Sequence, residues 1–445
     1  MSDVLFIDVM QNMAVGEAVW PNTGFGIIGA SIEKEGYSFS TIGIVLTEDK
    51  VKNLYEGGNL FHTELEKILE EKRPKIVVFS PLTHTYNKVI KLTGIVKQIQ
   101  PETVVCGGNI HVTAFPDQAL KDGFDYVFMK EGFFTFPRFV KEIMKGNKPT
   151  IKIIYPEKFI QNLDTLPFIS KNAWNNLKPA VFGLPFGMIS TSFSCLNSCK
   201  FCCNRNFAGT KWKMMSANRV IEEIKYQVDQ WNFSNFFITD PNNMLNEKSA
   251  YRMLNIVNRI KSEGLKIQFS GFMRLDVLSK LDKKIPHILD KILEMWNLVV
   301  VGVESISDDT LKDWRKNLSF NVIKKGFDAL VKRDITIGSG FMIGSFHDTR
   351  ESVKKMISFM RNIAIQPYSF KVSVQILTPY PITDFYNEVE QRGLLLSKDW
   401  DLYDEHHLLF KHPAFKPAEL EKIRNETNDE FTKNIKERVL RNFTK

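Results

Sequence analysis

Met188-Ile-Ser-Thr-Ser-Phe193, a short apolar strand pattern, is followed almost at once by Cys195-Leu-Asn-Ser-Cys199-Lys-Phe-Cys202. Three thiolates on so short a loop can wrap one face of an iron–sulfur cubane, and the C-x3-C-x2-C spacing leaves one iron without a protein ligand. The chain has 445 residues and only five cysteines, which argues for metal binding in a reducing compartment and against a disulfide framework. We therefore predict a [4Fe–4S] cluster on Cys195, Cys199 and Cys202, with its fourth iron open.

A zinc site is the main alternative for these cysteines. Zinc motifs usually combine C-x2-C pairs with a fourth Cys or His at a separated position. Cys203 directly follows Cys202, and its side chain should point away from that of its neighbour. Accidental spacing is a further alternative, which the sparse use of cysteine elsewhere argues against.

Downstream of the cysteines the chain alternates strands with helices. The predicted strands are residues 235–239, 267–271, 298–303, 335–343 and 369–377, and the predicted helices are 216–231, 248–262, 285–295, 320–332 and 349–361. Together with 188–193 they predict a partial (β/α)6 barrel at residues 185–390, whose functional groups lie at the carboxyl ends of its strands. A C-terminal helical segment follows at residues 391–445, in which 417–443 is a charged amphipathic helix.

Upstream of the cysteines a second alternating pattern occupies residues 1–145. Its predicted strands are 4–7, 39–46, 76–79, 103–106 and 125–129, and its predicted helices are 24–35, 62–71, 86–100 and 135–144. Strands separated by helices predict an α/β fold with a doubly wound parallel sheet. The periodicity lapses over residues 146–184, where Pro, Asn and Lys are frequent, and we predict a linker there.

The cysteine motif resembles the signature of the radical S-adenosylmethionine superfamily, in which an aromatic residue precedes the last cysteine, as Phe201 does here. The resemblance covers about residues 187–386. It implies that S-adenosylmethionine binds the open iron, that electron transfer breaks its sulfonium bond, and that a 5′-deoxyadenosyl radical removes a hydrogen atom from the substrate. It also implies an external reductant such as a flavodoxin or ferredoxin. The residues expected at this cofactor are Phe201, Asp240, Ser270, Arg274 and Glu304.

Glycines and polar residues follow the predicted strands of the first domain. The domain lacks G-x-G-x-x-G after its first strand, which argues against a dinucleotide. Its loops resemble those of the cobalamin-binding domain that precedes the cluster domain in one class of radical enzymes, and open α/β sheets bind ligands along this edge. The resemblance implies that cobalamin contacts Gly24, Ser80, Thr83, His84, Gly107, Gly108 and Glu131.

Met10 occupies the position of the lower axial histidine in cobalamin proteins that carry D-x-H-x-x-G. A histidine ligand to cobalt at that position is therefore excluded. Cobalamin domains of the radical class commonly lack this histidine, so its absence agrees with the resemblance. The loop 80–85 is then expected to face the cobalt, with an ordinary loop position as the alternative for His84.

The resemblance implies methyl transfer from methylcobalamin to a carbon centre of a small molecule or natural-product intermediate. Residues 375–386 and 390–393 are similar to the branch of the anaerobic magnesium-protoporphyrin monomethyl ester cyclase. Oxidation, cyclisation or ring rearrangement without methyl transfer is therefore one alternative, and a non-catalytic cobalamin or cluster sensor is another. Tyr380, His406 and His407 are candidate proton donors or acceptors in the substrate cavity.

Two classes of function are disfavoured. Methylthiotransferases need three further cysteines before the motif, and here Cys106 stands alone. The net charge of +8 comes from 59 Lys+Arg against 51 Asp+Glu, interleaved along helical faces, which predicts a solvated surface and no nucleic-acid partner. The sequence shows no signal-peptide pattern and no apolar run near the ~20 residues of a membrane span, so we expect a cytoplasmic protein without a membrane partner.

Overall fold

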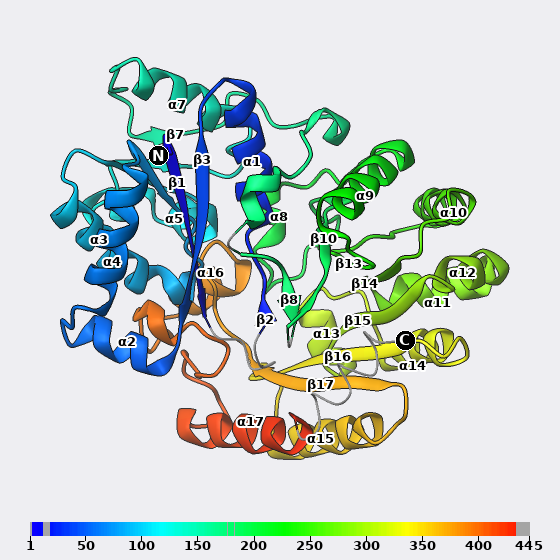
Figure 1. Ribbon diagram of the computed structural model, residues 1–445. Coiled ribbons are helices and arrows are strands. Elements are labelled where there is room, and N and C mark those ends of the chain that lie inside the picture. The colour runs from blue at the N-terminus through cyan, green and yellow to red at the C-terminus, as the bar shows by residue number, and fades with distance from the viewer. Residues whose placement is uncertain (1, 12–17, 176, 182, 433–445) are drawn as a thin grey trace. The chain divides into compact units, whose positions relative to one another are not determined.

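The computed structural model describes residues 2–11, 18–175, 177–181 and 183–432. The chain divides into two compact units, both of the predicted α/β class (Figure 1). The first unit comprises Met1–Gln161 and Thr165–Gly183, and the second comprises Asn162–Asp164 and Leu184–Lys445.

A six-stranded parallel sheet lies at the centre of the first unit. In hydrogen-bonded order its strands are β3 (Phe39–Leu46), β1 (Val4–Gln11), β4 (Ile76–Phe79), β5 (Val104–Gly107), β6 (Tyr126–Phe128) and β7 (Ile153–Ile154). β3 and β4 pair with opposite sides of β1. This reversal of strand order is the switch point of a doubly wound sheet, which confirms the predicted fold class.

The helices of the first unit include four that the sequence predicts and three that it does not. The predicted ones are α1 (Thr23–Lys34), α3 (Leu60–Lys72), α4 (Tyr86–Ile99) and α7 (Thr135–Met144), and the others are α2 (Glu48–Tyr55), α5 (Asn109–Ala114) and α6 (Pro116–Lys121). The unpredicted helices are short, and a short helix buries too few residues to show a periodic apolar stripe. α2, for example, buries Leu54 alone.

Most of the segment that the sequence suggests as a linker packs against the first unit. β7 extends the sheet by pairing with β6. The short helix η3 (Lys171–Trp174) lies against α1, where a Cβ on Gly26 would come 2.6 Å from Ile169 Cγ2 and 3.1 Å from Ala173 Cβ. The buried residues of this segment belong to no periodic element, so the sequence pattern does not reveal their burial.

The second unit contains another six-stranded parallel sheet, whose order follows the chain. Its strands are β10 (Gly187–Ile189), β13 (Asn235–Ile238), β14 (Gln268–Phe272), β15 (Trp296–Glu304), β16 (Thr336–Ile343) and β17 (Ser369–Ile376). This is the strand order of the predicted partial barrel. The predicted strand 188–193 is divided, because the chain leaves the sheet after β10 and β11 (Ser192–Phe193) pairs antiparallel with β12 (Lys213–Met214).

Helices connect these strands. Those of eight residues or more between the strands are α9 (Ala217–Trp231), α10 (Glu247–Ser262), α11 (Leu275–Lys284), α12 (Pro286–Leu293), α14 (Phe320–Val331) and α15 (Arg350–Ala364). α8 (Asn204–Ala208) and α13 (Asp308–Asp313) are shorter, and α16 (Asp384–Gln391) follows the last strand. The helix predicted near residues 285–295 is α12, which begins at Pro286, and α11 before it is not among the predicted helices.

The last helix, α17 (Pro417–Thr432), packs along β17, the edge strand of the second sheet (Figure 1). Asn428 accepts from the backbone N–H of Val374 at 3.0 Å and donates to its carbonyl at 2.7 Å. One side-chain amide thus satisfies the backbone N–H and C=O groups of Val374, as a neighbouring strand would. The predicted continuation of this helix to residue 443 lies outside the described residues.

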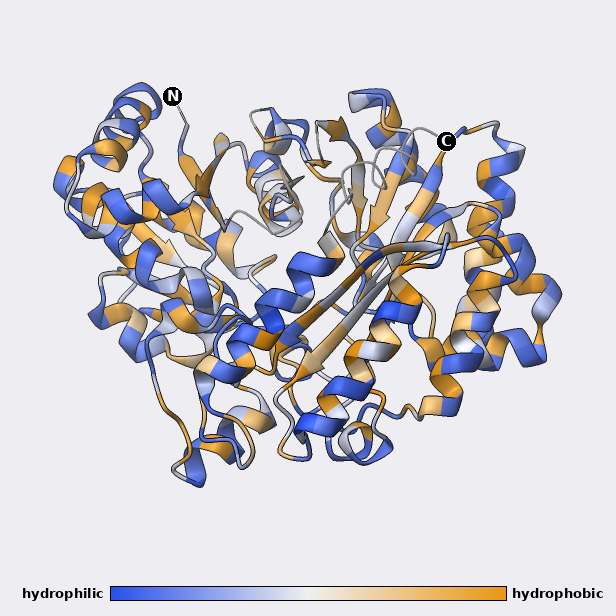
Figure 2. Cartoon of the chain, turned by 90° about the horizontal axis from the view of Figure 1, so that it is seen from below, coloured by the Kyte–Doolittle hydropathy of each residue, from blue (hydrophilic) through white to orange (hydrophobic). Residues whose placement is uncertain are grey.

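Apolar residues form the interior of both units. Val4, Leu5, Phe6 and Ile7 are wholly buried in β1. Figure 2 shows largely apolar strands and helices that carry both apolar and polar residues, as expected for helices with one side against a sheet. Among the described residues, no helix has the length and apolar character needed to cross a membrane.

Candidate cofactor sites

The three cysteines of the motif lie on the loop between β11 and α8, and their thiols are free. Cys195 and Cys199 are half-buried and Cys202 is exposed. Asn197 Nδ2 donates to Cys195 Sγ at 3.3 Å, and the N–H of Cys202 donates to the carbonyl of Cys199 at 3.1 Å. Free, accessible thiols on one short loop fit a [4Fe–4S] cluster held by three cysteines.

Within the described part of the chain, the cysteine loop included, no three His, Cys, Asp or Glu side chains lie close enough together to bind a single metal ion. A cubane does not require such convergence, because each thiolate binds a different iron.

Lys200 fixes the middle of the cysteine loop. Its N–H donates to the carbonyl of Trp314 at 3.0 Å, and its own carbonyl accepts from Phe385 at 3.0 Å. Its ammonium forms ion pairs with Asp313 at 2.9 Å and Glu388 at 2.5 Å. Burial lowers the pKa of Lys200, but the hydrogen bonds to the two carboxylates outweigh burial and the net shift of this pKa is upward. The loop is therefore anchored before any cofactor binds.

Lys316 brings together three of the predicted S-adenosylmethionine contacts. Its Nζ lies 2.7 Å from Glu304 Oε1 and 5.8 Å from the ring centre of Phe201. Its carbonyl accepts from Arg274 Nη2 at 2.7 Å. Glu304 has a φ of +66°, and a Cβ on Gly302 would lie 2.2 Å from its carboxylate. Gly302 therefore leaves room for Glu304. Lys316 itself lies after α13 and belongs to no sequence motif.

Two other predicted contacts, Asp240 and Ser270, are engaged within the protein. Asp240 is 1% exposed and accepts from the N–H and hydroxyl of Thr191 at 2.6 and 2.7 Å and from Ser192 Oγ at 2.8 Å. Burial raises the pKa of Asp240. Ser270 donates to Asn297 Oδ1 at 2.7 Å. Asp240 thus holds the chain where it leaves β10.

Asn242, which the sequence does not single out, follows Asp240 by two residues at the carboxyl end of β13. Its side chain is 1% exposed, and neither amide atom has a hydrogen-bond partner among the described residues. Buried amides are normally satisfied, so this one indicates a ligand. Asn242 therefore offers more to a cofactor than Asp240 does.

The candidate proton-transfer residues lie beyond β17. Tyr380 Oη donates to Glu405 Oε1 at 3.3 Å, and burial raises the pKa of both groups. His407 Nδ1 lies 2.9 Å from Asp404 Oδ1, and this hydrogen bond raises the pKa of His407. Burial lowers the pKa of His406, whose Nδ1 lies 3.6 Å from Asp404 Oδ2. Glu405 carries no sequence signal, although its φ of +67° marks a strained position.

In the first unit, a hydrogen-bond network joins the loops at the carboxyl edge of the sheet. Asp8 Oδ2 accepts from the N–H of Asn22 at 2.6 Å, and Asn22 Nδ2 donates to Ser80 Oγ at 3.0 Å. Asn109 Nδ2 donates to the carbonyl of Ser80 at 3.3 Å. Burial raises the pKa of Asp8 to about 6. The loops after β1, β4 and β5 therefore meet at Ser80, and the sequence identified only this residue of the four.

The predicted cobalamin glycines differ in the space around them. A Cβ on Gly24 would lie 2.9 Å from Asn22 Oδ1, and one on Gly107 would lie 3.0 Å from the Phe124 ring, so both serve local packing. A Cβ on Gly108 would meet no atom closer than Phe128 O at 3.8 Å. Gly108 is thus the glycine whose backbone a ligand can approach.

The remaining predicted cobalamin contacts differ in their exposure to solvent. Thr83 and Glu131 are buried, and Glu131 Oε2 accepts from the N–H of Ile160 at 2.9 Å. His84 is half-exposed, and Leu82 beside it is 44% exposed. An exposed leucine next to a histidine and the open backbone at Gly108 fit the broad, mainly apolar face of a corrin. Met10 lies within β1, and the loop after β1 includes residues 12–17, which are not among those described.

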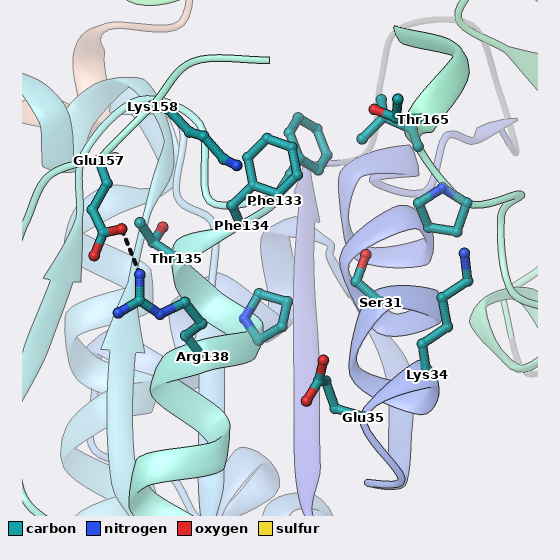
Figure 3. Close-up of a pocket in the computed structure, with 13 residues that line it drawn as sticks. Ser31, Lys34, Glu35, Phe133, Phe134, Thr135, Arg138, Glu157, Lys158 and Thr165 are labelled. Carbon is teal, nitrogen blue, oxygen red and sulfur yellow. Dashed lines mark hydrogen bonds and ion pairs between the residues drawn. The ribbon is translucent and has the colours of Figure 1, made fainter. Parts of the chain in front are cut away.

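A separate cavity of about 380 Å³ lies between α1 and α7 (Figure 3). Lys158 stands 5.0 Å from the ring centre of Phe134, and Arg138 pairs with Glu157. None of the predicted cobalamin residues lines it.

Two family models match this chain. Residues 189–360 match the radical SAM superfamily, and residues 12–140 match the B12 binding domain. The chain thus resembles a B12-binding domain over the first of these regions in chain order and a radical SAM domain over the second. Radical SAM domains use a [4Fe–4S] cluster and S-adenosylmethionine, and a B12-binding domain holds cobalamin, so the comparisons support all three predicted cofactors.

Similar proteins include several named methyltransferases. An uncharacterised methyltransferase of Pyrococcus horikoshii is 26% identical over 379 residues, covering 82% of this chain and 80% of that protein. Bacteriochlorophyllide d C-8(2)-methyltransferase of Chlorobaculum tepidum is 26% identical over 329 residues, covering 71% and 68%. The solved structure of the radical S-adenosylmethionine methyltransferase TsrM from Kitasatospora setae, with cobalamin and a [4Fe–4S] cluster bound, has a TM-score of 0.68 at 14% identity and covers 89% of this chain and 76% of that one. At that identity the likeness shows the fold.

Proposed function

We propose that this radical SAM protein is an enzyme that methylates a carbon centre of a small molecule with the help of cobalamin. The anchored loop with three free thiols carries this proposal, because it offers a cluster an iron that the protein leaves unligated. Relatives named as methyltransferases support the reaction class.

The cofactors, when bound, supply a 5′-deoxyadenosyl radical for hydrogen abstraction and a methyl group for transfer. In the proposed assignment Cys195, Cys199 and Cys202 ligate the cluster. Asn242 and the side chains gathered at Lys316 bind S-adenosylmethionine, with Glu304 accepting and Arg274 held in place by its bonds to Asp276 and Lys316.

The remaining roles in the proposal fall to two groups of residues. Ser80, His84 and Gly108 face the cobalamin. Tyr380 and Glu405 hold a proton between two atoms that are 3.3 Å apart, ready to pass it to or from a polar group of the substrate.

Cobalamin-associated oxidation, cyclisation or ring rearrangement is the second candidate. The observation that favours it is a 19% identity over 447 residues to the anaerobic magnesium-protoporphyrin IX monomethyl ester cyclase of Rubrivivax gelatinosus, which covers 94% of this chain. A non-catalytic sensor is the third candidate. An external flavodoxin or ferredoxin as electron donor, a cytoplasmic location, and the lack of nucleic-acid and membrane partners complete the proposal.

Anaerobic reconstitution tests these candidates against one another. The protein is supplied with iron, sulfide, cobalamin, a reductant and S-adenosylmethionine whose methyl group is deuterated, together with small molecules suggested by neighbouring genes. We expect 5′-deoxyadenosine and a product that has gained one labelled methyl group. Loss of two hydrogens without label would favour the second candidate, and the absence of 5′-deoxyadenosine would favour the third.

A further inference from the structure

Glycine and serine form part of the inner face of the last two barrel strands. Phe341 of β16 contacts Phe359 of α15 with ring centroids 6.2 Å apart, so Phe341 and its register partner Val374 face the helices. Side chains alternate along a strand. Gly340 and Ser373, each one residue earlier, therefore face the inside of the barrel.

Lys371 lies on the same inner face as Ser373, two residues earlier on β17, and its register partner is Gly338. A Cβ on Gly340 would meet no atom closer than 4.0 Å, and one on Gly338 none closer than 3.4 Å. The space opposite Ser373 is thus open to a ligand, whereas Val300 lies at ordinary contact distance from the position opposite Lys371.

Arg424 reaches this face from α17. Its Nε and Nη2 donate to Gln375 Oε1 at 3.2 and 2.9 Å, and its Nη1 donates to Asn425 Oδ1 at 2.9 Å. The residue is 7% exposed. Three of the five guanidinium N–H groups are used in this way, which leaves two for a ligand.

Neither cation of this face has a carboxylate partner. Lys371 and Arg424 form no ion pair with any residue that the structure describes. They are instead near enough to repel each other, and burial together with the charge of Arg424 lowers the pKa of Lys371 to about 8. Buried cations in proteins are normally paired. Two neighbouring cations without a carboxylate in direct contact are therefore a costly arrangement that a bound anion would relieve.

The nearest carboxylates do not provide that anion. Asp404 accepts from His407 Nδ1 and from the N–H of His406, both at 2.9 Å. Glu405 accepts from Tyr380. The charges of Asp404, Glu405 and the exposed Asp429 act on Arg424, but none of the three carboxylates forms an ion pair with it.

We propose that Lys371, Ser373 and Arg424 bind an anionic group, a carboxylate or phosphate, of the substrate. The substrate class is then an anionic small molecule, an inference that rests on the proposed function because it takes the inside of the barrel as the substrate cavity. Arginine binds carboxylates and phosphates through paired N–H groups, and lysine adds a point charge. Ser373 supplies a neutral donor between the two cations.

Calorimetric titration of the anaerobically reconstituted protein, with inorganic phosphate and with acetate as separate probes, tests this site. Lys371→Met and Arg424→Met remove one cation each, Lys371→Arg keeps the charge, and Lys355→Met removes an exposed lysine of α15 as the matched control. We expect saturable binding of at least one probe, weakened at least about tenfold by each methionine variant and little changed in the other two. Thermal melts identify a variant that fails to fold. If Arg424→Met fails to fold, Lys371→Met still tests the site, because Lys371 is only half-buried.

The result is separable from that of the proposed function because binding is measured without turnover. If neither probe binds saturably, or if both methionine variants bind like the wild type, the anion site is refuted even when 5′-deoxyadenosine and a methylated product form. If a probe binds and Lys371→Met weakens it, the site stands even when no 5′-deoxyadenosine is made. A preference for acetate or for phosphate then tells which anionic group the substrate carries.

Discussion

The two units carry their candidate functional residues at the carboxyl ends of similar parallel sheets, but the sequence reveals these residues more clearly in the second unit than in the first. In the second unit the proposed cluster ligands Cys195, Cys199 and Cys202 form a spacing that can be recognised in the sequence. In the first unit the sheet edge is built from hydrogen bonds among Asn22, Ser80 and neighbouring loops and from the open backbone of Gly108. A site that binds iron through cysteines can be recognised from their spacing. A site that binds its ligand through its shape and its backbone consists of common residues, which no spacing distinguishes.

The largest expected effect comes from removing one thiolate of the motif. Cys199→Ala leaves two protein ligands for the cluster, so we expect the bound iron to fall sharply and 5′-deoxyadenosine formation to drop to background. Iron and sulfide analysis and product chromatography after anaerobic reconstitution measure both.

Cys203→Ala is the matched control, since Cys203 is the next thiol along the chain after Cys202. Its Sγ lies 3.8 Å from the carbonyl of Pro381, and its loss should leave the iron content unchanged. Equal iron loss in both variants would contradict the assignment of the three ligands.

A smaller effect is expected from replacing Lys316, whose contacts with the predicted cofactor residues could not be inferred from sequence spacing. Lys316→Met leaves Glu304 without its 2.7 Å partner, and we expect a loss of about 10- to 100-fold in activity, as for residues that orient cofactor ligands. The rate of 5′-deoxyadenosine formation against S-adenosylmethionine concentration should show a raised KM.

Lys312→Met, an exposed residue of α13, is the control for the loss of a lysine in this region. Lys316→Arg keeps the charge beside Glu304 and should recover part of the activity. An unchanged KM in Lys316→Met would mean that this group of residues does not contact the cofactor.

The first unit is tested by the pH dependence of its stability. Burial raises the pKa of Asp8 from 3.8 to about 6, so between these values the folded state binds more protons than the unfolded state. The free energy of unfolding therefore falls as pH rises from about 4 to about 6, by ~3 kcal/mol at most. Asp8→Asn keeps an acceptor for Asn22 and should remove this fall.

Urea unfolding at about pH 4 and about pH 7 measures the effect, with hydrogen exchange of β1 amides to locate it in the first unit. The variant should gain stability relative to the wild type at the higher pH only. Asp49→Asn, an exposed position of α2, should follow the wild type. A parallel pH dependence of Asp8→Asn and wild type would show that Asp8 is not the group responsible.

The fold could be predicted from the sequence because long amphipathic helices and buried strands have clear periods. β3 and α7 have the predicted bounds. Short helices such as α2 and α5, of eight and six residues, were missed because they hold too few turns to show a clear period. The packing of η3 against α1 depends on contacts between distant residues, which no local pattern records.

The candidate site was predictable where one residue type is chemically necessary. Phe201, Arg274 and Glu304 do come together, but through Lys316, whose sequence neighbours carry no signal. Asp240 looked available because a carboxylate at a strand end often faces a ligand, yet three donors from Thr191 and Ser192 surround it. Whether a polar group is already satisfied is a property of the folded chain alone.

The sheet edges extend the comparison between the units and give the smallest expected effect. One edge of the first sheet is β7, a strand of only two residues that gives little to pair with, and the other is the eight-residue β3. The second ends in the eight-residue β17, which Asn428 covers through two hydrogen bonds to Val374. Asn428→Ala should cost ~1–2 kcal/mol, at about 1 kcal/mol for each bond.

Hydrogen exchange at β17 measures this cost, because the amide of Val374 loses its acceptor. We expect its exchange to accelerate by roughly 5- to 30-fold, while amides of β13 stay protected. Glu426→Ala, an exposed residue of the same helix, controls for a change in helix propensity. If both variants exchange alike at Val374, packing of the whole helix α17 protects this edge and the single amide of Asn428 does not.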